Sequence, residues 1–341
     1  MDFSSDTSAP AHPNVIEALK AVNQGNAASY GADSVTQRLH GQLADLFETK
    51  DFDFWLCASG TAANALALSL LCPPIGGVLC HKYAHIAEDE RGAPEFFTGG
   101  GKLILLSGAH GRIEAAELSA ALSHMDPGFV HATPPSVLSL TNLTESGTAY
   151  SPDQIADYAQ IARKAGLTVH MDGARLGNVL ISTGASPARM SWQAGIDILT
   201  LGLTKCGAIG AEIIMLFGRR RAQFAELKAR AKRAGHMPPK MRYLAAQAEA
   251  LLQDNLWLDL SSHANQRAKK FTEIILGISG ARLAHPVEGN EVFVNLSEDL
   301  VQKLNQSGAK FYPWPDGSYR FVCHWTTPQA DIDQIGDILK A

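Results

Sequence analysis

Three short segments of the chain contain residue types that together suit one kind of chemistry. In the first, the polar turn Ser59-Gly60-Thr61 follows an apolar run and precedes an apolar stretch of helical character. A helix N-terminus presents free N–H groups and a partial positive charge, which suit a phosphate. Gly60 would let the backbone approach closely, and the Thr61 hydroxyl would add a donor. The alternative is an ordinary turn capped by a serine or threonine side chain.

The second segment places a carboxylate and a guanidinium at the end of a predicted strand. Asp172 follows the apolar run Leu167–Met171, and Arg175 lies three residues further along. Open α/β sheets bind ligands beyond the carboxyl ends of their strands, so both side chains are candidates for a ligand site. The alternative is a strand-end aspartate that caps the next helix, beside a surface arginine.

The third segment contains a single lysine, Lys205, among small and apolar residues between two predicted strands. Lysine avoids such surroundings unless it has a function. Desolvation would lower the pKa of its amine and make it a nucleophile toward carbonyl compounds. The alternative is a loop lysine whose ammonium group reaches solvent.

Taken together, the three segments supply what pyridoxal phosphate needs. The phosphate would bind at the helix N-terminus near Gly60, and Lys205 would form a Schiff base with the aldehyde. Asp172 would keep the pyridine nitrogen protonated, so that the ring can accept electrons. Along the chain, the phosphate-binding turn comes first, then the aspartate and then the lysine. This is the order of the aspartate-aminotransferase-like class.

Further segments make the chain resemble the threonine aldolases of the low-specificity L-threonine type. The matching segments follow the order of that family over almost the whole chain, and the D-G-A-R segment together with the N-terminal S-D-T is their most specific part. They are Ser4–Thr7, Ser59–Asn64, His85, His170–Asn178, Lys205 and Arg320–His324.

The resemblance implies a role for each matched residue. Lys205 would bind the cofactor covalently, and Asp172 would pair with the pyridine nitrogen. Gly60 and Thr61 would hold the phosphate. His85 would stack on the face of the ring and assist proton transfer.

The substrate carboxylate is implied to lie between Ser5, Arg175 and Arg320, because a guanidinium fork matches a carboxylate bidentately. Arg175 also counts among the residues expected beside the cofactor. A further cofactor contact is expected from the basic stretch Arg219–Arg233, although a solvated helix face is the alternative for most of its members. The candidates there are Arg230, Lys232 and Arg233.

The chain departs from the family in one loop. Many members carry a histidine after the strand that ends near Thr141, where it helps to activate the substrate hydroxyl, but this chain has Leu143-Thr144-Glu145-Ser146-Gly147. The base that removes the hydroxyl proton is therefore left open between Glu145, His85 and a water molecule.

The activity implied by the resemblance is a retro-aldol cleavage. A lyase of this kind converts L-threonine, L-allo-threonine or related β-hydroxy-α-amino acids to glycine and an aldehyde. Two alternatives are another pyridoxal-phosphate reaction on a small amino acid, such as β-elimination or racemisation, and a non-catalytic ligand-binding homologue. The family also implies a homo-oligomer, either a dimer or a tetramer.

The elements that must position these residues follow from the apolar pattern. Short apolar runs alternate with amphipathic helical stretches over residues 26–235, which predicts an α/β domain with a mainly parallel sheet covered on both faces. One helix is expected from Ser34, and another at Ser151, where a capping box occurs. The expected strands are Phe54–Ala58, Val78–Cys80, Lys102–Leu106, Val137–Thr141, Leu167–Met171, Ile196–Leu201 and Ala211–Phe217.

The sequence pattern changes after residues 236–239. Two long helical stretches, at 241–253 and 256–276, precede strands expected at Glu291–Leu296 and Tyr319–Cys323. This predicts a small α+β domain over residues 236–341, with residues 1–25 as a separate N-terminal segment.

Composition narrows the class of protein. With 341 residues, 46% hydrophobic and 18% charged, the chain is expected to be globular. A net charge of −5 argues against a nucleic-acid partner, and no apolar run approaches the roughly 18 residues that span a bilayer. The five cysteines are scattered and no metal-ligand spacing occurs, so neither disulfides nor a metal are expected, and the location is expected to be cytoplasmic.

Overall fold

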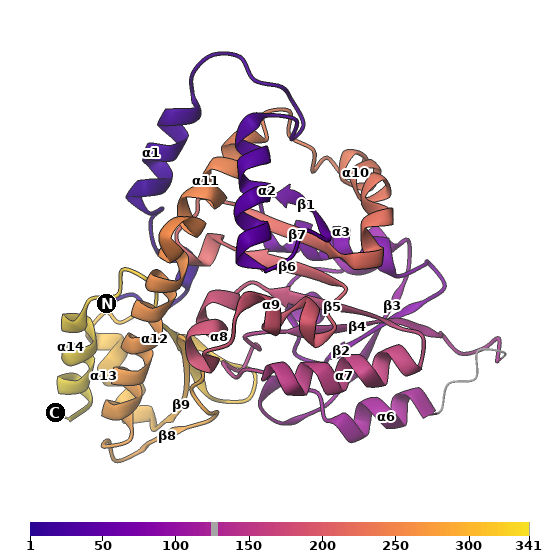
Figure 1. The fold of residues 1–341 in the computed structure, drawn as a ribbon. Helices are drawn as coiled ribbons and strands as arrows, with labels where there is room; N and C mark the ends of the chain where they lie inside the picture. The colour runs from indigo at the N-terminus through magenta and orange to yellow at the C-terminus, as the bar shows by residue number, and fades with distance from the viewer. Residues whose placement is uncertain (124–128, 341) are drawn as a thin grey trace.

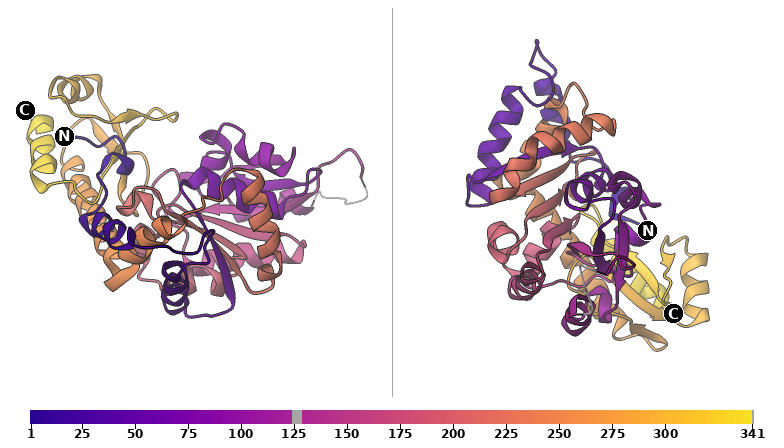
Figure 2. Two further views of the ribbon diagram at one scale, coloured as in Figure 1. Left: turned by 90° about the horizontal axis from the view of Figure 1, so that it is seen from above. Right: turned by 90° about the vertical axis from the view of Figure 1, so that its right-hand side faces the viewer.

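The computed structural model describes residues 1–123 and 129–340, and it contains two β-sheets of unequal size with helices packed around them (Figure 1). The smaller sheet lies at the end of the molecule where both chain termini are found (Figure 2). Within the described ranges, no helix is both long and apolar enough to cross a membrane. The helices are α1 (Pro13–Val22), α2 (Ser34–Leu46), α3 (Gly60–Leu71), α4 (His85–Glu88), α5 (Ala93–Thr98), α6 (Ala115–Ser123), α7 (Pro152–Lys164), α8 (Leu176–Thr183), α9 (Pro187–Met190), α10 (Phe224–Arg233), α11 (Arg242–Leu252), α12 (Leu256–Ile275), α13 (Glu298–Gln306) and α14 (Gln329–Lys340).

The larger sheet has seven strands in the order β1-β7-β6-β5-β4-β2-β3. The pairings from β3 to β6 are parallel, whereas β7 runs antiparallel to both β6 and β1. The predicted α/β class with a mainly parallel sheet is therefore confirmed. The strands are β1 (Phe52–Cys57), β2 (Gly77–His81), β3 (Lys102–Leu106), β4 (Pro135–Thr141), β5 (Thr168–Gly173), β6 (Ile198–Gly202) and β7 (Glu212–Phe217).

Local signals account for the helices around this sheet. The capping box of α7 is present: Ser151 Oγ accepts the Gln154 N–H at 3.2 Å, and Gln154 Oε1 accepts the Ser151 N–H at 2.9 Å. Helix α3 crosses the sheet from β4 to β1 and is covered in turn by α5 and α10. Because it is buried on all sides, α3 is apolar along nearly its whole length rather than amphipathic.

Strand direction brings the ends of β1, β4, β5 and β6 to one edge of the larger sheet. Strand β1 is antiparallel to β7 and β7 to β6, so β1 ends at the same edge as β4, β5 and β6. In register, Glu212 at the start of β7 lies between Cys57 and Gly202. The segments that follow these strands, and the first residue of β7, therefore meet at this edge.

The smaller sheet is antiparallel, with the strand order β10-β11-β9-β8. The expected strand at Glu291–Leu296 is β9, and β11 (Tyr319–Val322) ends one residue before its predicted bound. Two further strands, β8 (Ala281–Leu283) and β10 (Tyr312–Pro313), were not predicted. They are too short to show the alternation by which a strand is recognised.

Two hydrophobic clusters underlie the two sheets, and α12 contributes to both. Trp257 belongs to the larger cluster, whereas Phe271 and Ile275 belong to the smaller one. The N-terminus joins the smaller cluster through Phe3, whose N–H donates to the Lys310 carbonyl at 2.9 Å. Helix α11 packs against α1 and α2. The division of the chain at residues 25 and 235 stays a prediction.

We expect the substitution Gly202→Ala to destabilise the edge of the sheet at which the strands end. A Cβ on Gly202 would lie 2.6 Å from the Ala174 Cα and 2.7 Å from its carbonyl oxygen, so the backbone that follows Asp172 would have to shift. The free energy of unfolding should fall by roughly 1–3 kcal/mol, as measured by urea denaturation.

The matched control is Gly41→Ala in α2, where a new Cβ meets no atom within 4 Å. This substitution should raise the free energy of unfolding by up to about 1 kcal/mol, because alanine is the better helix former. If the Gly202→Ala variant is as stable as the wild type, the close approach of the two backbones does not require a glycine at position 202.

Candidate active site

A cavity of about 230 Å³ opens at the edge of the larger sheet where β1, β4, β5 and β6 end. The first turn of α3, helix α4, the loop after β4 and the turn after β6 all contribute to its wall. Most of the candidates from the sequence meet here although they lie far apart along the chain. Those that line the cavity are Gly60, Thr61, His85, Glu145, Asp172, Arg175 and Lys205.

The first turn of α3 forms one wall of this cavity. Ser59 caps the helix by accepting the Ala62 N–H at 3.3 Å, and a Cβ on Gly60 would have no atom within 4 Å. The first N–H groups of a helix have no partner within the helix. The N-terminus of α3 therefore has an open surface and unused N–H donors, which suit the phosphate predicted to bind there.

The carboxylate of Asp172 lies at the end of β5 and is almost fully buried. Its Oδ1 accepts the Ala174 N–H at 3.0 Å, and its Oδ2 accepts an amide hydrogen of Asn64 at 2.8 Å. Both oxygens thus serve as acceptors with fixed positions. Such a group can accept one more hydrogen from a protonated ring nitrogen.

Lys205 occupies the short 3₁₀ turn Thr204–Cys206 between β6 and β7 and lines the cavity. The carboxyl group of Glu212 lies beside this turn, where the Thr204 hydroxyl donates to it. Burial raises the pKa of Glu212 to about 7, although the Thr204 hydrogen bond and the charge of Lys205 act in the opposite direction. The lysine therefore has a carboxyl group near it that can hold or release a proton at neutral pH.

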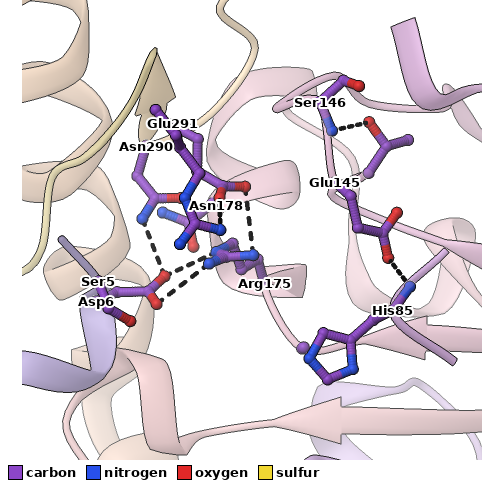
Figure 3. Close-up of polar contacts among 12 residues, drawn as sticks. Ser5, Asp6, His85, Glu145, Ser146, Arg175, Asn178, Asn290 and Glu291 are labelled. Atoms are coloured by element: carbon purple, nitrogen blue, oxygen red, sulfur yellow. Dashed lines mark hydrogen bonds and ion pairs between the residues drawn. The ribbon is translucent and has the colours of Figure 1, made fainter. Parts of the chain in front are cut away.

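Arg175 is held by two buried carboxylates (Figure 3). Its Nε and Nη2 donate to Asp6 at 2.7 and 3.2 Å, and its Nη1 lies 3.3 Å from Glu291 Oε2. Burial raises the pKa of Asp6, but the charges of Arg175 and Lys205 outweigh it and lower the value to about 2. The guanidinium is therefore fixed in orientation and largely neutralised.

The other two residues expected at the substrate carboxylate lie outside the cavity lining. Ser5 accepts the N–H of Thr7 at 3.1 Å, and it is Thr7 that reaches the cavity wall. Arg320 stacks 4.6 Å above the Trp314 ring, with its Nη1 3.9 Å from Glu291 Oε1. Glu291 thus links Arg320 to the Arg175 cluster.

Glu145 and His85 lie side by side in the cavity wall (Figure 3). Glu145 Oε1 accepts the backbone N–H of His85 at 2.6 Å, whereas Oε2 is buried without a hydrogen-bond partner. Burial raises the pKa of Glu145 to about 7. A carboxyl group with one unused oxygen and a pKa near neutrality is suited to accept a proton.

No role was predicted for Glu90 or for Asn64, the last residue of the matched segment Ser59–Asn64, although both contact the predicted residues directly. Asn64 donates to both Asp172 and Glu90, and Glu90 Oε1 lies 2.9 Å from His85 Nδ1. A polar residue one turn into the apolar helix α3 is a signal that could have identified Asn64. Glu90 has no such signal, because the loop after α4 alone determines its position.

The basic candidates of α10 lie elsewhere in the described chain. Arg230 pairs with Glu226 at 2.6 Å, and Lys232 lies over the Tyr30 ring. Arg230 and Arg233 line a separate hollow of about 720 Å³ between α3, α5 and α10. None of the three lines the cavity that contains Lys205.

Comparison with known proteins identifies the family of the chain. A family model described as beta-eliminating lyase matches residues 2–299. A low-specificity L-threonine aldolase from Pseudomonas aeruginosa is 38% identical to this chain over 340 residues, which span 99% of this chain and 96% of the relative.

Two solved structures share the fold over nearly the whole chain. A threonine aldolase from Leishmania major superposes with a TM-score of 0.91 at 27% identity and covers 99% of this chain and 98% of its own. A histidinol-phosphate aminotransferase from Clostridium acetobutylicum superposes with a TM-score of 0.73 at 15% identity, over 100% of this chain and 98% of its own, and so shows the fold alone. The chain therefore belongs to the beta-eliminating lyase family and, as its motifs predicted, is a relative of the low-specificity L-threonine aldolases.

Proposed function

We propose that the chain is a lyase that binds pyridoxal 5'-phosphate and cleaves L-threonine, L-allo-threonine or related β-hydroxy-α-amino acids to glycine and an aldehyde. The observation that carries the proposal is that the α3 N-terminus, Asp172 and Lys205 line one cavity. The name of the Pseudomonas aeruginosa relative supports the choice of substrate.

The residues present fit the cofactor. The open face at Gly60 and the Thr61 hydroxyl would hold the phosphate, Asp172 would face the ring nitrogen and Lys205 would bind the aldehyde carbon. His85 would lie against the ring. When bound, the cofactor supplies an electron-accepting ring for the bond that breaks at the substrate Cα.

Arg175 is the group proposed to orient the substrate by its carboxylate. Asp6 and Glu291 already engage the guanidinium, so a substrate carboxylate would share its donors with them. This arrangement favours orientation over strong attraction, because much of the positive charge is neutralised before the substrate binds. Ser5 and Arg320 would contribute from the rim of the site, through Thr7 and Glu291.

Glu145 is the group that we favour as the base for the substrate hydroxyl. Its Oε2 is buried in the cavity wall and lacks a hydrogen-bond partner, which costs about 1–3 kcal/mol unless a ligand supplies one. The substrate hydroxyl group could donate a hydrogen bond to this oxygen. Glu145 occupies the loop for which the family resemblance implies a histidine, so the proton acceptor would be a carboxylate here.

A second candidate reaction is β-elimination, because the matching family model is described by that activity. The two reactions give different products from the same protein. Release of free aldehyde and glycine from L-threonine supports the aldol cleavage, whereas release of pyruvate and ammonia from L-serine supports the elimination. A homo-oligomeric state and a cytoplasmic location are also part of the proposal.

The substitution Lys205→Ala should abolish turnover and leave the fold intact. Removing a covalent nucleophile costs roughly 10³-fold or more in rate. The measurement is acetaldehyde release from L-threonine, together with circular dichroism to monitor folding. Lys164→Ala, at an exposed site on α7, is the matched control and should retain full activity. Near-normal turnover by Lys205→Ala would exclude the lysine from the reaction.

The substitution Glu145→Gln should lower kcat/KM by roughly 10²- to 10⁴-fold, the range for losing a positioned base. A base must be ionised to accept a proton, so wild-type activity should rise as the pH increases through about 7, which is the pKa of Glu145.

The Glu145→Gln variant should lack this rise in its pH–rate profile. Ser146→Ala, at the next position of the same loop, tests for general disturbance of the loop and should keep the wild-type profile. An unchanged rise in the Glu145→Gln variant would assign the proton transfer to another group.

A further inference from the structure

Four side chains, three in the cavity wall and Glu90 behind them, form one continuous hydrogen-bonded chain. Asn64 Nδ2 donates to Asp172 Oδ2 at 2.8 Å and to Glu90 Oε1 at 2.9 Å. Glu90 Oε1 lies in turn 2.9 Å from His85 Nδ1. The proposed reaction as described so far assigns no task to Asn64 or Glu90.

Burial makes the direction of these hydrogen bonds matter. Asn64 is 1% exposed and Glu90 is 4% exposed, so solvent does not compete for their polar atoms. Asn64 Oδ1 and Glu90 Oε2 have no hydrogen-bond partner among the described side chains. The contacts that join Asn64 to Asp172 and Glu90 are therefore both made by its amide nitrogen.

The amide group fixes which atoms are acceptors. An amide nitrogen only donates, so the Asp172 and Glu90 oxygens that it contacts both accept. Rotating the amide by half a turn would place its oxygen against two carboxylate oxygens, which is repulsive. The hydrogen between Glu90 and His85 is then best placed on His85 Nδ1, which leaves Nε2 as the second ring nitrogen.

The charges around His85 are consistent with this placement. The hydrogen bond that His85 donates to Glu90 raises the pKa of His85, and this effect exceeds that of burial, which lowers it. The charge of Asp172 acts with Glu90, and that of Lys205 acts against them. Burial raises the pKa of Glu90 above its ordinary value, although its hydrogen bonds to His85 and Asn64 act in the opposite direction. Glu145 contacts the same residue, but through the backbone N–H.

We propose that Asn64 and Glu90 are positioning residues that keep a proton on Nδ1 of His85 and thereby present Nε2 as the nitrogen that exchanges protons in the cavity. The pair also ties the imidazole to Asp172, so the carboxylate expected at the ring nitrogen and the histidine expected on the ring face keep a fixed spacing. The inference deepens the proposed function and rests on it for the identity of the reacting partner.

The test is ¹⁵N NMR of the histidine side chains in the full-length apoprotein over a range of pH. The His85 signals are assigned by their absence from the spectrum of His85→Gln. In the wild type, neutral His85 should carry its hydrogen on Nδ1, and its pKa should lie above the ordinary value of about 6.5. A wild type with the hydrogen on Nε2 would overturn the proposal, and this part of the test needs no variant.

The substitution Glu90→Gln preserves an oxygen that can accept from Asn64 and His85 but removes the charge. We expect it to lower the pKa of His85 by about one unit or more. An unchanged pKa would overturn the proposal. Glu88→Gln, at the exposed end of α4, is the matched control and should leave the pKa of His85 as in the wild type.

In the Asn64→Ala variant, neutral His85 should populate both tautomers. If the variant keeps the wild-type tautomer, Asn64 does not have the proposed positioning role.

A second readout uses the cofactor-loaded protein. Because Glu90 does not line the cavity, Glu90→Gln should lower kcat for L-threonine by the order of 10-fold and change KM little, as expected for a carboxylate that orients a histidine. A variant with an unchanged kcat, or one in which only KM changes, would contradict the inference.

The inference and the proposed function fail in different ways. A wild type that does not cleave β-hydroxy-α-amino acids would refute the proposed function, whereas the NMR result would still stand. An active wild type whose His85 is unaffected by Glu90→Gln would refute only the inference.

Discussion

The carboxylate of Asp172 is the point at which the separate parts of the site are joined. One oxygen accepts from the backbone at Ala174, immediately before Arg175, and the other accepts from Asn64 in α3. The same helix presents its N-terminus to the cavity, so one helix positions both the proposed phosphate site and Asp172. Gly202 on β6 lies close against Ala174, which fixes the turn between Asp172 and Arg175. A parallel sheet with its strand ends at one edge makes this convergence geometrically direct.

Buried carboxyl groups surround this point, and their surroundings divide them into two kinds. Asp6 pairs closely with Arg175, and its pKa is lowered to about 2, so it serves as a permanent counter-charge. Glu145 and Glu212 lack such a close partner, and burial raises the pKa of each to about 7. Carboxyl groups that are poised near neutrality can exchange protons, whereas those paired with arginine cannot. In the proposed reaction, the partner of each acid therefore separates the groups that would orient the substrate from the groups that would move its protons.

Much of the fold was predictable because its signals are local. The bounds of β3 and β9, the capping box at Ser151 and the start of α2 at Ser34 follow from apolar runs and capping residues that are adjacent in sequence. The strand β8 and the placement of Phe3 in the smaller cluster were not predicted. A three-residue strand shows no periodicity, and the burial of Phe3 depends on a pairing with residue 310. Elements whose stability comes from distant partners leave no mark on their own sequence.

The sequence by itself determined the family of this chain, because the polar turn before α3, the strand-end aspartate and the lone lysine among apolar residues are recognisable by type and order. Only the tertiary structure decided how those groups are tuned. Asn64 and Glu291 touch the recognised residues from elements far away in the chain, and Glu90 touches His85 from the loop that follows α4. These contacts set orientation and protonation. The reason is physical: hydrogen-bond direction and the pKa of a buried group depend on which atoms pack around it, and packing is a property of the folded chain.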